Sequence, residues 1–111
     1  MKLNSLIFCL LLFSCSNNTS NIKIIPKNKF VQILKDIHLA EADYEMNKSK
    51  GEIKAQENLS SSYHAIFSSY DITNSLFDNT MSYYSNNPEQ LEEIYYLTLQ
   101  MISDEKDSQY D

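Results

Sequence analysis

The chain has 111 residues and a formal net charge of −6, with nine lysines, no arginine, one glycine and two prolines. Its length supports one small domain with a modest core. The acidic balance excludes a nucleic-acid-binding surface, which needs a basic footprint. The scarcity of Gly and Pro disfavours a turn-rich β protein and favours long helices.

Residues 1–14 have the composition of a secretory signal peptide: Lys2 supplies a positive start and Leu6–Phe13 an apolar run. That run would form a helix of only about 12 Å, too short for a hydrocarbon core of about 30 Å. The apolar run ends in Leu12–Cys15, which is typical of a lipobox. We therefore predict cleavage between Ser14 and Cys15 and acylation of Cys15, giving a chain held at a membrane by its lipid. The alternative is an ordinary secretory signal with an incidental cysteine, because Phe13 is large for its position.

The residues that follow predict a location and a tether. Ser16 is not the Asp that would favour retention in the inner membrane, so we expect the periplasmic leaflet of the outer membrane. Residues 15–26 form the acylated tether and a lead-in, in which Pro26 keeps the preceding residue extended. Because Cys9 leaves with the signal and Cys15 carries lipid, no thiol remains for a disulfide or a metal.

Four helices are predicted over residues 27–103, making an all-α bundle. The first covers about 29–47 and the second about 52–70, each with apolar residues at helical spacing on one face. The third runs to about Ser85 and starts at a Thr73 cap supported by a hydrophobic staple. The fourth starts at Pro88 after an Asn87 cap and runs to about Ser103.

Two expectations concern the end of the chain. The fourth helix is apolar around most of its circumference, so we expect it to lie centrally, covered by the other three. Residues 104–111 are charged and are expected to form a disordered acidic tail. Acids are concentrated toward this end: ten of them and one Lys follow Lys54, whereas seven Lys and five acids lie between Cys15 and Lys54. This uneven charge distribution suits a domain tethered beside anionic lipid head groups. Alternatively, the acidic residues simply keep a small domain soluble.

An unusual feature of the first predicted helix is a pair of ionisable residues on its apolar face. At about 100° per residue, Glu41 lies close to the direction of Phe30, and His38 lies on the same side. Three interpretations remain open: a structural pair with a Tyr hydroxyl or backbone group of a facing helix, the border of a binding groove, or a metal or catalytic site that would also recruit His64. The His-x-x-Glu order is the reverse of the di-iron repeat.

Other signs of catalysis are missing from the sequence. With Gly51 as the only glycine, a phosphate-binding loop, a dinucleotide turn and a nucleophile elbow are impossible. We therefore predict a protein that is not an enzyme and needs no cofactor or metal. Two tyrosine doublets, Tyr83-Tyr84 and Tyr95-Tyr96, are candidates for a contact surface. Since neighbouring helical residues point about 100° apart, each doublet can place one ring in the core and one at its rim, which is also what ordinary packing would produce.

These residues resemble a family of short Bacteroidota lipoproteins that carry the domain of unknown function number 4296. The resemblance rests on Asp36–Ala42 and on Ser82–Tyr84 followed by Asn87–Glu89, and it covers nearly all of the chain after the tether. It implies a helical envelope lipoprotein and supplies no catalytic residue. The family tends to have Gly where this chain has Asp71, a residue that tolerates the left-handed cap conformation. The helical layout is also loosely similar to the substrate-binding part of periplasmic foldases, which is an argument from fold alone.

Three functional hypotheses follow. The first is an accessory subunit of an outer-membrane complex, which docks on a protein partner through the tyrosine-bearing and acidic faces of the last two helices. The second is a chaperone-like or ligand-binding module with an open apolar groove bordered by His38 and Glu41. The third is a metalloprotein or hydrolase, which requires His38, Glu41 and His64 to converge.

Overall fold

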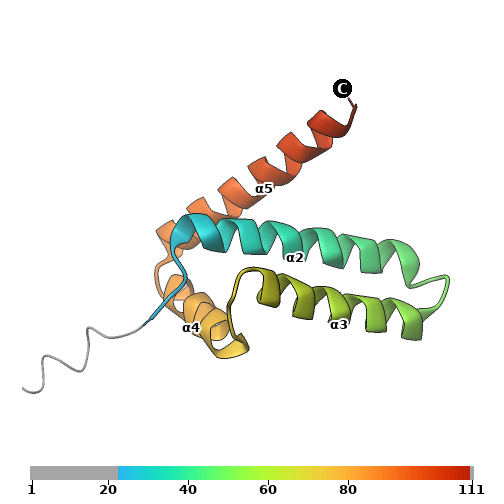
Figure 1. Cartoon of the computed structure of the whole chain (residues 1–111). Helices are drawn as coiled ribbons and strands as arrows, with labels where there is room; N and C mark the ends of the chain where they lie inside the picture. The colour runs from blue at the N-terminus through green and yellow to red at the C-terminus, as the bar shows by residue number, and fades with distance from the viewer. Residues whose placement is uncertain (1–22, 111) are drawn as a thin grey trace, which may run out of the picture.

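The computed structural model describes residues 23–110 and shows an all-α protein of four helices, as the sequence predicts (Figure 1). They are α2 (Lys27–Asn47), α3 (Glu52–Ser69), α4 (Asn74–Ser85) and α5 (Pro88–Tyr110). No strand occurs between residues 23 and 110, and none of the helices described there is long and apolar enough to cross a membrane. The predicted signal peptide, Ser14, Cys15 and the polar part of the tether lie outside the described residues.

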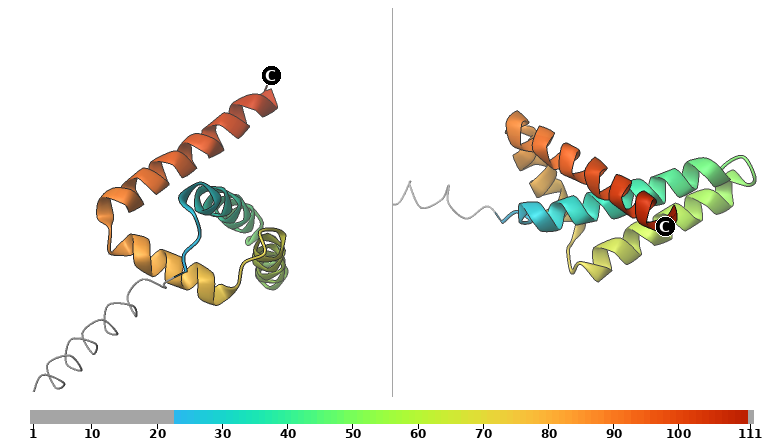
Figure 2. Two further views of the ribbon diagram at one scale, coloured as in Figure 1. Left: turned by 60° about the vertical axis from the view of Figure 1, so that its left-hand side comes forward. Right: turned by 90° about the horizontal axis from the view of Figure 1, so that it is seen from above.

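Helix α2 is the centre of the fold. It packs against both α3 and α5, while α4 packs against α5 (Figure 2). Its buried face supplies a large share of the core: Phe30, Val31, Ile33, Leu34 and Ile37.

The expectation that the fourth helix would be central is wrong. Ile94 and Thr98 of α5 are buried, but Tyr96 and Leu99 are 62% and 64% exposed. The physical reason is that α5 is covered along one stripe only, by α2 and α4, and extends away from α3 (Figure 1). An apolar circumference therefore did not lead to burial on all sides.

A cluster of aromatic rings joins three of the helices. Phe77 of α4 lies 5.7 Å from Phe30 of α2 and 5.2 Å from Phe67 of α3, measured between ring centroids, and Tyr84 stacks on Phe30 at 5.5 Å. These distances are within the range of favourable aromatic pairs. The cluster therefore joins the C-terminal end of α3 and two residues of α4 to the first half of α2.

The turn between α3 and α4 follows local rules that the sequence shows. Asp71 has φ 54°, the left-handed conformation predicted for it. Its N–H donates to the Ser68 carbonyl at 3.2 Å and the N–H of Ile72 donates to the Phe67 carbonyl at 3.0 Å, which is the Schellman pattern. Thr73 then caps α4 by accepting the N–H of Leu76 at 3.1 Å, as predicted.

The folded domain begins before the predicted boundary at residue 27. Ile25 is only 1% exposed, and its N–H donates to Thr80 Oγ1 at 2.9 Å. The Thr80 hydroxyl in turn donates to the Leu76 carbonyl at 2.7 Å. The lead-in is thus fastened to α4 and belongs to the core.

The end of α5 also differs from the expectation. The predicted helix end at Ser103 is too early, because α5 continues to Tyr110 where a disordered tail was expected. No Gly or Pro follows Pro88 to interrupt the helix. Glu105 is held to α2 by an ion pair with Lys35 at 2.7 Å, and Ser108 donates to the Glu105 carbonyl at 2.8 Å.

Candidate functional site

An open groove of about 900 Å³ lies between α2, α3 and α4, with Tyr95 of α5 at its edge. The apolar faces of the three helices point inward but do not close completely against one another. The floor of the groove is therefore apolar. The apolar lining residues are Leu34, Ile37, Phe67, Ile72, Phe77 and Met81.

The polar residues of the groove come from the same three helices. The three residues that the sequence raised for a possible site, His38, Glu41 and His64, all line it. The remaining polar lining residues are Ser60, Tyr63, Ser68, Asn74 and Asp78. The sequence therefore identified groove residues in the middle of α2 and on α3, and the structure adds α4 as the third wall.

Glu41 forms the kind of pair that was predicted as the structural interpretation. The Tyr63 hydroxyl of α3 donates to Glu41 Oε1 at 2.8 Å. Burial of the ring, followed by this bond to a carboxylate, raises the pKa of Tyr63 to about 12. The bond uses one carboxylate oxygen and leaves acceptor capacity on the other. Glu41 thus serves as a structural partner and as groove lining at once, whereas His38 is exposed beside it.

The sequence reasoning missed a second polar network, which ties α3 and α5 to α2. The Tyr70 hydroxyl donates to Asp36 Oδ2 at 2.7 Å, and Lys35 lies 3.2 Å from Asp36 Oδ1 and 2.7 Å from Glu105 Oε1. Burial and then the bond to Asp36 raise the pKa of Tyr70, and the bond to Glu105 is the main cause that raises the pKa of Lys35. The only sequence signal was the presence of Asp36 in the motif that carries the family resemblance.

The proposed metal site does not take shape in the described part of the chain. His38, Glu41 and His64 share the groove, but between residues 23 and 110 no three His, Cys, Asp or Glu side chains are placed to hold one ion.

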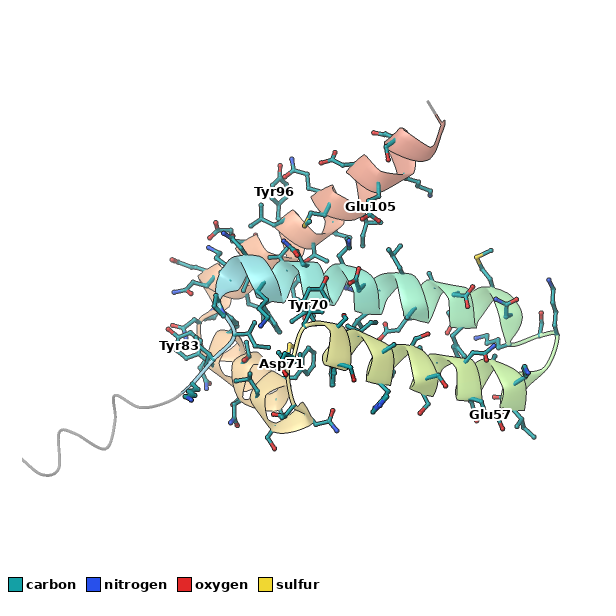
Figure 3. The ribbon with its side chains drawn as sticks, viewed as in Figure 1. Glu57, Tyr70, Asp71, Tyr83, Tyr96 and Glu105 are labelled. Atoms are coloured by element: carbon teal, nitrogen blue, oxygen red, sulfur yellow. The ribbon has the colours of Figure 1, made fainter. Side chains whose placement is uncertain are left out.

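The two tyrosine doublets behave differently. Tyr84 is 3% exposed and packs in the core, whereas Tyr83 is 38% exposed, so the first doublet divides as predicted. Tyr84 is therefore unavailable as a contact residue. In the second doublet both rings are accessible: Tyr95 is 41% exposed at the groove edge and Tyr96 projects from α5 into solvent (Figure 3).

Comparison with known proteins gives one match, to a family model. The family model described as "Domain of unknown function (DUF4296)" matches residues 22–108, which include all of α2, α3 and α4 and nearly all of α5. No curated protein and no solved structure matches the chain. The match begins three residues before the buried Ile25, so it coincides with the folded domain. The chain belongs to the family of the domain of unknown function DUF4296.

Proposed function

We propose that this protein is a lipid-anchored, non-catalytic binding module of the bacterial cell envelope, an accessory subunit that holds part of a partner protein in the groove between α2, α3 and α4. The observation that carries the proposal is the open groove itself, with six apolar side chains on its floor. Apolar surface left in water forgoes about 25 cal/mol per Å². Contiguous patches of this kind, rimmed by polar groups, mark interaction sites.

The anchor is supported by the lipobox-like Leu12–Cys15. Lys23, the first described residue, follows Cys15 by only eight positions. At about 3.5 Å per extended residue, the domain would stay within roughly 30 Å of a bilayer. That distance suits a subunit of an envelope complex, and our preferred location is the periplasmic leaflet of the outer membrane in a Bacteroidota cell.

Mass spectrometry of the purified protein tests the anchor. We expect a mature chain that starts at Cys15 with acyl groups attached, and the Cys15→Ser variant should lose acylation and leave the membrane fraction. An intact Met1 without added acyl mass would remove the anchor from the proposal.

Site-specific photo-crosslinking in intact cells tests the groove. Ser60 lines it, while the neighbouring Ser61 is exposed and does not. A crosslinker at position 60 should give a discrete protein adduct that a crosslinker at position 61 does not give. Equal adducts from both positions would show that the contact is not in the groove.

A second candidate surface is favoured by the exposure of Tyr96 (Figure 3) and by that of Leu99, also on α5. Large exposed side chains three residues apart lie on one side of a helix, and Tyr is common at contact surfaces. A crosslinker at position 96 separates the alternatives. An adduct from position 96 alone would move the interface to α5, the surface first expected from the tyrosine doublets.

Metal analysis tests the proposal against the metalloprotein hypothesis. The full-length protein, purified without chelators, should contain no stoichiometric transition metal. One bound metal per chain, lost in His38→Ala or His64→Ala, would instead favour the metalloprotein hypothesis.

A further inference from the structure

The charged side chains that line the groove indicate which class of molecule can bind in it. Its two acidic residues stand on different walls, Glu41 on α2 and Asp78 on α4, and both are exposed. No Lys or Arg is among the groove-lining residues that the structure describes. An occupant therefore meets negative charge on two sides of an apolar floor.

The dimensions of the groove suit a short stretch of helix. Along α3 its lining runs from Ser60 to Ser68 and along α2 from Leu34 to Glu41. At 1.5 Å per residue these spans are about 10–12 Å, which corresponds to two helical turns. An amphipathic helix that lies in such a groove contributes apolar anchors spaced three, four and seven residues apart.

Two other classes of occupant fit less well. A small apolar ligand normally has about 70–90% of its surface buried, whereas this groove is partly open to solvent. A fatty acid or anionic lipid would bring its negative head group beside Glu41 or Asp78 with no lining Lys or Arg to compensate, and like charges disfavour the complex.

We propose that the groove binds a cationic amphipathic helix of the partner protein, with its apolar side chains on the floor and a Lys or Arg beside Glu41 and Asp78. This inference rests on the proposed function and adds the chemistry of the partner segment. Glu41 keeps its bond from Tyr63 in the complex, because a carboxylate accepts several hydrogen bonds.

Binding of synthetic peptides to the full mature chain tests the inference. Three peptides of about 15 residues share one Leu-rich face and differ only in carrying Lys, Gln or Glu on the polar face. We expect affinity to fall in the order Lys, Gln, Glu, with the Lys peptide weakened by added salt. Isothermal titration or fluorescence anisotropy measures the dissociation constants.

Charge-removing variants locate the effect. Glu41→Gln, which retains an acceptor for the Tyr63 hydroxyl, and Asp78→Asn should each weaken the Lys peptide about threefold and leave the Gln peptide unchanged. The matched control is Glu57→Gln, because Glu57 is exposed on α3 and does not line the groove (Figure 3). Ser60→Trp should block every peptide and Ser61→Trp none, with circular dichroism confirming that each variant is folded.

The inference is overturned if the Gln or Glu peptide binds as tightly as the Lys peptide, if no peptide binds, or if Glu57→Gln weakens binding as much as Glu41→Gln does. Tighter binding of a fluorescent fatty acid than of the Lys peptide would also overturn it. These failures leave the proposed function standing when the crosslinker at position 60 still gives its adduct in cells. Loss of that adduct, with peptide binding intact, would remove the proposed function instead.

Discussion

Thr80 and Thr98 show how much the role of a residue depends on one hydrogen bond. Both side chains are completely buried, and each hydroxyl donates to the carbonyl four residues earlier in its own helix. Only Thr80 also accepts a bond from a distant segment, the N–H of Ile25 at 2.9 Å. Thr80 therefore joins the lead-in to α4, whereas the hydrogen bond of Thr98 stays within α5.

Substitution of each threonine by valine, which has nearly the same shape, tests this difference. Thr80→Val leaves the buried N–H of Ile25 without a partner and should lower the free energy of unfolding by about 1–3 kcal/mol. Thr98→Val removes a bond to a carbonyl that keeps its helical partner, so its change should stay within about 1 kcal/mol. Urea denaturation of both variants gives the comparison, and equal losses would refute the proposed role of Thr80.

The raised pKa of Tyr63 predicts that the stability of the fold depends on pH. Its pKa is raised to about 12 in the folded protein, against about 10 for an ordinary tyrosine. The folded state therefore favours the protonated phenol, and this contribution is fully present below about pH 10 and is lost as the pH rises toward about 12. Tyr63→Phe should flatten the fall of stability across that interval. Tyr96→Phe, at an exposed ring on α5, serves as the control; a fall as steep in Tyr63→Phe as in the parent would contradict the assignment.

At the scale of the element, α5 shows where a helix extends beyond its packing. Ile94 and Thr98 are buried in its first half. Beyond Ser103 the side chains are exposed as far as Ser108, and the Lys35–Glu105 pair connects this part of α5 to α2. The charged composition suggested disorder, but no Gly or Pro interrupts this part of the helix, and the Lys35–Glu105 pair joins it to α2.

Glu105→Gln tests the role of this ion pair. Glu105 is about half exposed, so the global free energy of unfolding should change by no more than about 1 kcal/mol. The local effect should be larger: amide hydrogen exchange after Ser103 should accelerate because these turns open separately from the core. The exposed Asp104→Asn is the matched control, and unchanged exchange in Glu105→Gln would show that the pair does not hold the helix end.

At the scale of the whole molecule, the fold is three helices arranged around α2. The core residues of α2 meet α3, α5 and the aromatic cluster of α4. The packing does not bury all of the apolar surface, because the groove beside α2 stays open and one side of α5 stays in water. A small domain of this kind has little stability to spare.

Phe30→Ala tests the central position of α2. Phe30 is fully buried and its ring contacts Phe77 and Tyr84, so its truncation should cost about 3–5 kcal/mol and unfold much of the population. Leu39→Ala on the same helix, where the side chain is 42% exposed, should change stability by less than about 1 kcal/mol. Thermal denaturation followed by circular dichroism measures both, and similar losses would mean that α2 is not central.

The sequence by itself determined the features that depend on neighbouring residues. The four helices, the Thr73 cap and the left-handed Asp71 are local outcomes of helical periodicity, side-chain hydrogen bonding and backbone sterics. The position of Glu41 on the apolar face also follows from the helical period.

Only the tertiary structure decided which faces meet. The hydrophobic pattern predicted α5 as the central helix, but the crossing of the helices placed α2 there and left Tyr96 in water. The same crossing paired Glu41 with Tyr63 and Asp36 with Tyr70, and it left the groove open between three helices. The physical reason is that an apolar stripe specifies a surface to be buried, whereas its partner depends on crossing angles and turn geometry set by the whole chain.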